Sequence, residues 1–177
     1  FLPAMILVVF GIYSAGSVTH GFVSYYTASK LLLSGRLGPL AYDDEWFGAE
    51  VKATTGSDVR EIFIPNPPTM SLMAAPLVPF DARAARAMWL AGSVGAFVAS
   101  VWALAGWTSR RGRTLPVAVM LLVLLAPAVF TNLRIGQGYL FVFALFAFAV
   151  ILIGQGREWL GGALLGALLA LKTSGVA

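Results

Sequence analysis

The sequence predicts an all-α integral membrane protein, a polytopic helical bundle with one long polar segment after its first span. Hydrophobic residues make up 59% of the 177 residues and charged residues only 11%, whereas soluble domains carry about 25% charged residues. The mean hydropathy is +0.84. Six of the eight carboxylates fall within residues 20–80, so the acidic groups are concentrated in one stretch between apolar runs.

Residues 1–19 form the first expected span, because they are apolar apart from Ser14, Ser17 and Thr19. The rival interpretation is the core of a signal peptide that is cleaved near the Ser-Ala-Gly-Ser sequence. We favour a retained span, since no positively charged region precedes it and further spans follow. The chain begins inside an apolar run without Met and ends just past another, so we expect an N-terminal fragment of a longer protein.

Residues 20–81, here called the polar segment, are expected to form a long extracytoplasmic first loop that carries interfacial helices. Apolar and aromatic residues over Phe22–Ser34 predict an amphipathic helix at the membrane surface, ended by Gly35. Trp46–Thr55 is expected to be a second short helix. Residues 65–80 contain five prolines, which break helices, and an apolar run of twelve residues. That run is too short to span a membrane, so we expect it to be re-entrant or interfacial.

Four further spans are expected where apolar runs are bounded by polar or glycine-containing turns, at residues 82–107, 115–131, 138–153 and 159–172. Asp81 is a good N-cap for the first of these helices, because a carboxylate can accept hydrogen bonds from the free N–H groups of a helix start. The last run is rich in Gly and Ala, whose small side chains let neighbouring helices approach closely.

The basic residues predict the orientation of the spans. Three arginines lie in the short loop 108–114, and short loops rich in Arg face the cytoplasm. Counting spans from this loop places the polar segment, Arg134 and Lys172 together on the outer face of the cytoplasmic membrane. We therefore expect a multi-pass protein with an extracytoplasmic active site. The net charge of +4 reflects this topology, and we expect no nucleic-acid partner.

The stretch Asn132–Gly138 is the most informative, because it places an amide, a guanidinium and a second amide in a turn between two apolar runs. Hydrocarbon cannot satisfy such groups, so they need water, a protein partner or a ligand. A single interfacial arginine such as Arg134 commonly anchors a helix end by snorkelling. With Asn132 and Gln137 beside it, phosphate binding is an equal alternative, because a guanidinium offers paired donors and keeps its charge.

The remaining candidates each have a structural alternative. His20 can pack where the first span leaves the membrane, or act as an acid or base near neutral pH. Asp43 can be a solvated loop acid or the N-cap of the helix that follows. Tyr25 and Tyr26 are more often interfacial aromatic residues than ligand contacts. Lys172, at the end of an apolar helix, snorkels by default.

Composition excludes several kinds of site. The sequence has no cysteine, so a disulfide framework, a thiol nucleophile and a thiolate metal site are impossible within it. A single histidine excludes a multi-histidine metal site, and no phosphate-loop, dinucleotide or zinc-protease motif is present. We expect no metal and no cofactor.

Four motifs, in order, resemble glycosyltransferase family 87, which includes polyprenol-phosphate-mannose-dependent mannosyltransferases. They are Tyr25–Gly35 with Tyr42-Asp43 after it, the proline-containing Ile64–Pro68, Asn132–Gln137, and the Gly-rich helix 156–172 that ends in Leu-Lys. The resemblance implies a GT-C-like fold and an inverting mechanism. Two departures matter. The family's expected catalytic Asp is replaced by His20-Gly21, and Tyr139 stands where the family usually has Asn.

The resemblance implies transfer of a mannose-like or arabinofuranose sugar from a polyprenyl-phosphate donor in the bilayer to a lipid or glycan acceptor. His20 and Asp43 are then the candidate bases. The candidate substrate-binding residues have side chains that can hydrogen-bond to a sugar or phosphate: Tyr25, Tyr26, Asn66, Asn132, Arg134, Gln137 and Lys172. Two alternatives stay open, namely a transporter or flippase fragment, and a catalytically inactive GT-C relative that acts as an assembly partner.

Overall fold

A computed structural model describes residues 18–64, 66–109 and 114–171, and this part of the chain is helical without a strand. Its elements, in order, are α2 (His20–Leu33), η1 (Pro39–Tyr42), α3 (Asp44–Thr55), η2 (Pro68–Leu72), η3 (Ala75–Leu77), α4 (Ala82–Ser109), α5 (Thr114–Ile135), α6 (Tyr139–Gly154) and α7 (Glu158–Leu171). The first expected span, apart from its last two residues, lies outside the described residues, as do the loop arginines 110, 111 and 113 and Lys172.

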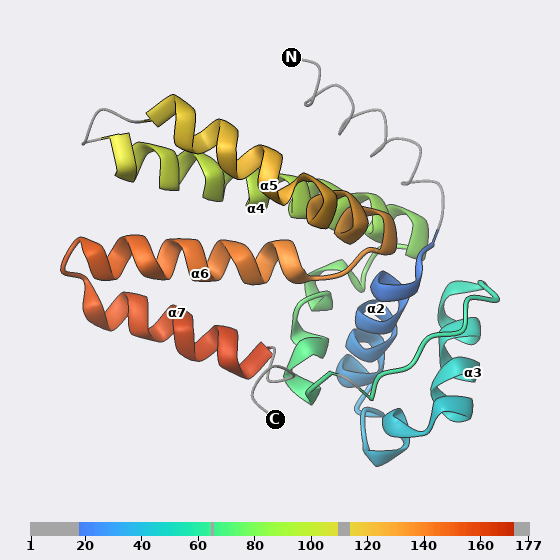
Figure 1. The fold of residues 1–177 in the computed structure, drawn as a ribbon. Helices are drawn as coiled ribbons and strands as arrows, with labels where there is room; N and C mark the ends of the chain where they lie inside the picture. Colours follow the sequence, from blue (N-terminus) through green and yellow to red (C-terminus); the bar gives the residue numbers. More distant parts are fainter. Residues whose placement is uncertain (1–17, 65, 110–113, 172–177) are drawn as a thin grey trace.

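The helices divide into two groups (Figure 1). Helices α4 to α7 lie side by side and form what we call the helix layer, in which α4 packs against α5 and α6, and α6 packs against α7. Helices α2 and α3 and the short 3-10 helices gather at one end of this layer. The turn between α5 and α6 and the end of α7 lie at that same end, and the Thr69 hydroxyl donates to the Ala170 carbonyl there.

Helix α2 lies at the centre of the polar segment rather than on its surface. Its residues from Gly21 to Ser29 are all buried, because α3, η2, η3 and α4 pack around it. The sequence predicted a helix with one exposed polar face over Phe22–Ser34, and the structure corrects this. The proline-rich stretch folds into two 3-10 helices, and these pack on the face of α2 that we expected to be exposed to solvent.

The helix ends follow from local residue chemistry. The Asp43 carboxylate accepts from the Trp46 N–H (2.8 Å) and caps α3, which confirms the second short helix. The Asp81 carboxylate accepts from the N–H groups of Arg83 (2.9 Å) and Ala84 (3.1 Å), and α4 begins at the next residue, as predicted. Gly35 ends α2 with a φ of 70°, a conformation that glycine adopts without steric cost.

Helix α5 continues further than the sequence predicted. Asn132, Leu133 and Arg134 belong to its last turn, and only Gly136–Gly138 form the connection to α6. Gly136 ends the helix with a φ of 80°, and the N–H groups of Gly136 (2.8 Å) and Gln137 (3.1 Å) both donate to the Asn132 carbonyl. This is a Schellman-type end, which turns the chain without leaving those groups unsatisfied.

Within the described residues, one helix, over Ala82–Thr108, is long and apolar enough to cross a membrane. Helices α6 and α7 are apolar and occupy the positions of the last two expected spans, but they are shorter than the helix over Ala82–Thr108.

Candidate functional site

The start of α2 docks directly against the turn between α5 and α6, and two glycines allow this close contact. A Cβ atom on Gly136 would lie 2.7 Å from Thr19 Oγ1 and 2.9 Å from Phe22 Cβ. A Cβ atom on Gly21 would lie 2.8 Å from Gln137 Nε2. Real Cβ atoms do not approach other atoms so closely. We call this contact, between residues 19–25 and 136–138, the corner.

A hydrogen bond between the buried Tyr25 and the half-buried Gln137 crosses the corner. The Tyr25 hydroxyl donates to Gln137 Oε1 at 2.6 Å. Burial raises the pKa of Tyr25 to about 12, so the phenol keeps its proton at neutral pH and acts as the donor. Gln137 is thereby held against α2. Two residues that the sequence proposed as substrate contacts are brought together here, and each satisfies the other.

Asn132 builds the turn. With its amide oriented to suit its neighbours, it donates to the Gln137 carbonyl (2.7 Å) and accepts from the Tyr139 N–H (3.2 Å). Its side chain is buried. These bonds use the amide to shape the turn, which explains a polar residue at this position without a ligand.

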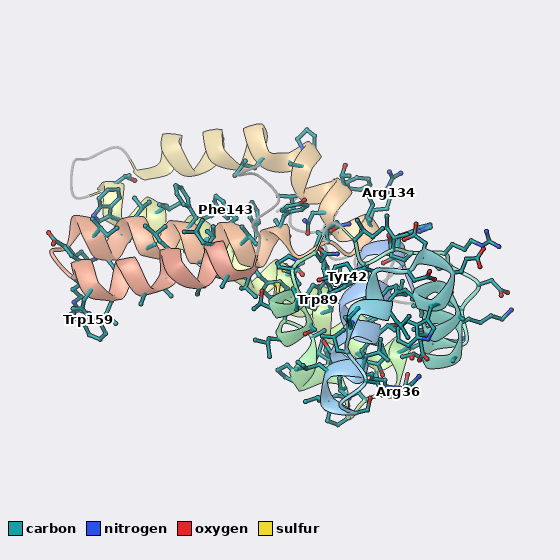
Figure 2. All side chains as sticks on the ribbon, turned by 90° about the horizontal axis from the view of Figure 1, so that it is seen from below. Arg36, Tyr42, Trp89, Arg134, Phe143 and Trp159 are labelled. Atoms are coloured by element: carbon teal, nitrogen blue, oxygen red, sulfur yellow. The ribbon has the colours of Figure 1, made fainter. Side chains whose placement is uncertain are left out.

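Arg134 differs from its two amide neighbours because its side chain is exposed. Figure 2 shows it at the end of α5, where the helix layer meets the polar segment. An exposed guanidinium at this junction can reach an anionic group that lies beside the corner.

His20 is the first residue of α2, and its side chain is 66% exposed. Its Nδ1 atom lies 3.2 Å from the Arg60 carbonyl and 3.7 Å from Glu61 Oε2. The imidazole therefore stands between the corner and the stretch that precedes the prolines.

Asp43, the second candidate base, is placed differently. Its carboxylate is engaged by the Trp46 N–H at the start of α3. The alternative that treated it as a helix cap is confirmed, and this bond leaves its second carboxylate oxygen for any further role.

A cavity of about 890 Å³ lies between α3 and the stretch that follows it. Its walls include four carboxylates and two basic side chains: Asp44, Glu45, Asp58, Glu61, Lys52 and Arg60. Lys52 and Asp58 form an ion pair at 2.7 Å. Glu61 lines this cavity and also lies against His20, so the imidazole adjoins its edge.

The other predicted site residues lie apart from this group. Tyr26 is fully buried and its hydroxyl donates to the Phe80 carbonyl at 2.5 Å, which makes it part of the core. Asn66 is buried, and its backbone carbonyl accepts from the Tyr42 hydroxyl at 3.3 Å. Lys172 lies outside the described residues.

The family model for glycosyltransferase family 87 matches residues 63–177. The chain belongs to glycosyltransferase family 87. No curated protein and no solved structure matches it significantly. Family 87 membership makes the protein a glycosyltransferase, whose substrates are a sugar donor and an acceptor. The match covers η2, η3 and the helix layer, while His20, the cavity and α3 precede it.

Two residues within the family 87 match belong to the site although the sequence did not suggest them. Arg86 is fully buried and its Nη2 donates to the Leu133 carbonyl at 2.7 Å. Trp89, one turn later on α4, donates from Nε1 to the Gly136 carbonyl at 3.0 Å. A cation is favoured at a helix C-terminus, so these two side chains hold the end of α5 and the turn in place.

The surroundings of Arg86 are apolar. Its guanidinium lies over the Phe22 ring at 5.8 Å, and its Nε and Nη1 atoms have no hydrogen-bond partner among the described residues. The sequence feature that could have identified Arg86 is an arginine within an apolar helix, three residues before a tryptophan. A buried charge is costly to keep, which sets this position apart from an ordinary helix residue.

For metal binding, the described ranges contain no cluster of three or more His, Asp or Glu side chains that could hold an ion.

Proposed function

We propose that this glycosyltransferase moves a mannose-like or arabinofuranose sugar from a polyprenyl-phosphate donor to a lipid or glycan acceptor at the outer face of the cytoplasmic membrane. The observation that carries the proposal is the junction of two unlike regions. An apolar helix layer meets a polar, cavity-bearing segment at one end, and the exposed Arg134 lies where they meet. A donor with an isoprenoid tail and a phosphate head needs both surroundings.

The chemistry is an inverting displacement at the anomeric carbon. A base takes the proton of the acceptor hydroxyl, and the acceptor oxygen forms a bond to the anomeric carbon. The bond between that carbon and the phosphate oxygen breaks, and polyprenyl phosphate leaves with the electron pair. A base within hydrogen-bond reach of the hydroxyl is required. His20 is our first candidate because its imidazole is exposed beside the cavity, and Asp43 is the second.

Charge develops on the departing phosphate, so a positioned cation accelerates the step. Arg134 is the candidate within the described residues, and Lys172 is a second candidate from sequence. The donor tail would lie along the helix layer, which places the phosphate at the level of the corner. Tyr25, Asn132 and Gln137 would act by shaping that corner.

The test uses membranes that contain the full-length protein. They are given radiolabelled polyprenyl-phosphate mannose or polyprenyl-phosphate arabinofuranose, and we expect label to move to a glycolipid or glycan. Arg134→Ala should lower the rate by about 10²–10³-fold, the usual effect of removing a group that stabilises developing charge, with normal expression. Arg157→Ala is the matched control, because Arg157 is an exposed arginine at the other end of the layer.

Other outcomes would overturn the proposal. Binding of the donor without transfer would favour an inactive assembly partner. Passage of the donor across the bilayer with its sugar bond intact would favour a transporter. Transfer that is equally fast in Arg134→Ala and in wild type would remove Arg134 from the mechanism.

The orientation of the protein in the membrane can be tested by cysteine labelling, because the sequence contains no cysteine that would give background labelling. Ala53→Cys on α3 and Gln155→Cys in the turn between α6 and α7 both replace exposed residues. In intact cells a membrane-impermeant maleimide should label the Ala53→Cys variant only. Labelling of the Gln155→Cys variant alone would reverse the orientation.

A further inference from the structure

We propose that Glu61 is a positioning residue that fixes the orientation of His20 and supports its charge when it accepts a proton. This inference rests on the proposed function, since it assigns His20 as the base. Glu61 lies outside the family match and 41 positions after His20, and no sequence motif links the two residues.

The backbone around Glu61 is tied to the start of α2 at two points. The Arg60 carbonyl lies 3.2 Å from His20 Nδ1, and the Ser24 hydroxyl donates to the Ile62 carbonyl at 3.4 Å. His20 and Ser24 are one helical turn apart. The stretch 60–62 therefore runs along the first turn of α2, and Glu61 is held beside the imidazole.

The side chain of Glu61 is oriented as well. Its Oε1 atom accepts from the Ile62 N–H at 3.1 Å, and its Oε2 atom lies 3.7 Å from His20 Nδ1. One oxygen is thus used by the backbone while the other faces the ring. The Glu61 side chain is only 21% exposed, so its charge acts on the imidazole with less screening than a surface carboxylate would.

These contacts select one nitrogen of His20 as the base. A carbonyl oxygen can only accept a hydrogen bond, so Nδ1 carries the proton in the contact with Arg60. The lone pair is then on Nε2. When Nε2 takes the proton from an acceptor hydroxyl, the ring becomes an imidazolium, and the neighbouring Glu61 carboxylate stabilises it. This is the role of a third group that orients a base.

The cavity supplies the place for the acceptor. Glu61 lines it together with Asp44 and Glu45, and carboxylate oxygens accept hydrogen bonds from sugar hydroxyls. The acceptor end would therefore be a polyhydroxylated glycan. Its reacting oxygen joins the anomeric carbon of the donor, its proton passes to Nε2 of His20, and polyprenyl phosphate leaves with the electrons of the broken bond.

The experiment measures kcat and KM for transfer by the full-length protein in membranes, with four variants. His20→Ala should lower kcat by about 10²–10⁴-fold, the range for removing a general base. Glu61→Gln keeps an acceptor for the Ile62 N–H and removes only the charge. We expect it to lower kcat on the order of tenfold, since the site is partly solvated, with KM and thermal midpoint unchanged.

The decisive variant is the double substitution. If Glu61 acts through His20, adding Glu61→Gln to His20→Ala should have no further effect on kcat. Glu50→Gln is the control, because it removes a carboxylate that pairs with Arg36 and does not line this cavity. It should match wild type.

Three results would overturn the inference: a further loss in the double variant equal to the loss in the single variant, a change in KM or thermal midpoint alone, or full activity of His20→Ala. A wild-type protein that transfers no sugar would instead overturn the proposed function, so the two failures are distinguishable.

Discussion

The polar segment and the helix layer are both helical and both bury apolar side chains, but they expose opposite kinds of surface. In the polar segment large aromatic side chains such as Phe22, Tyr26 and Phe47 are fully buried, and the charged residues are exposed or half-buried. In the layer, Trp102 and Trp159 are each 76% exposed, and Figure 2 shows Trp159 pointing away from the neighbouring helices. Both regions have an apolar core, but the layer also carries large apolar side chains on its outside, which a bilayer would cover.

A transferase with a lipid-linked substrate needs both kinds of surface around its reacting groups. Neither region alone offers both an apolar path and polar groups. The corner is one of the places where they touch, and residues from α2, α4 and the end of α5 hold it together. Arg86 and Trp89 hold the turn from one side, while Tyr25 holds it from the other.

The largest loss of stability should come from the core of the polar segment, where aromatic side chains are buried. Phe22→Ala removes a ring that stacks on Tyr26 (5.4 Å between centroids) and packs on Trp89 (6.0 Å). It should lower the free energy of unfolding by about 3–5 kcal/mol. Phe146→Ala, on the outer side of α6, is 52% exposed and should change it by about 0.5 kcal/mol or less. Chemical denaturation in one detergent measures both. Equal losses would mean that the outer face of α6 is packed against protein.

The next prediction tests the contact between the two regions. Gly136→Ala places a side chain at a φ of 80° and against Thr19 and Phe22. Gly156 has nearly the same φ, 79°, but open space around it. Gly156→Ala should therefore cost only the left-handed strain, about 1–2 kcal/mol, and Gly136→Ala more than that. The difference between their thermal midpoints isolates the contact, and the transfer rate should fall only in Gly136→Ala. Equal shifts would show that the corner is not tightly packed.

A smaller effect is expected from the hydrogen bond across the corner. Tyr25→Phe leaves Gln137 Oε1 without its donor. Because Gln137 is only half-buried, we expect a loss of about 0.5–1.5 kcal/mol, the net contribution of a typical hydrogen bond. Tyr42→Phe is the control, since its hydroxyl makes a longer bond of 3.3 Å at a half-exposed position. Denaturation curves and transfer rates are compared for both variants. If Tyr42→Phe is the more destabilising change, the corner is not the stronger link.

The sequence predicted most of the helix layer, because its elements follow from local signals. Hydropathy and the Asp81 cap placed α4, and apolar runs between glycines placed α6 and α7. The polar residues Asn132 and Arg134 were read as a turn although they continue α5. The glycine that ends the helix, Gly136, was the better signal.

The polar segment was harder to predict, because its arrangement depends on contacts between distant residues. The burial of α2 arises from 3-10 helices some forty residues later, and a periodicity of side chains carries no information about them. The same holds for the site. The approach of Glu61 to His20 and of Arg86 to the Leu133 carbonyl each join elements whose pairing only the folded chain defines. The sequence proposed Tyr25, Asn132 and Gln137 as substrate contacts, and that stays a prediction. Their hydrogen bonds within the corner are visible only in the structure.

The smallest expected effect concerns Asp81, at the boundary between the two regions. Hydrogen bonds from the N–H groups of Ala84 and Arg83 lower the pKa of its carboxyl below the ordinary value of 3.8. The unfolded chain therefore binds the proton more readily than the folded chain does. The stabilisation by this cap is fully present above the unfolded pKa and is lost as the pH falls through the folded value. Asp81→Asn keeps a neutral cap, so its midpoint should lie below that of wild type at pH 7 and approach it near pH 3. Thermal midpoints at both pH values measure this, and a gap of constant size would mean that the charge of Asp81 does not stabilise the start of α4.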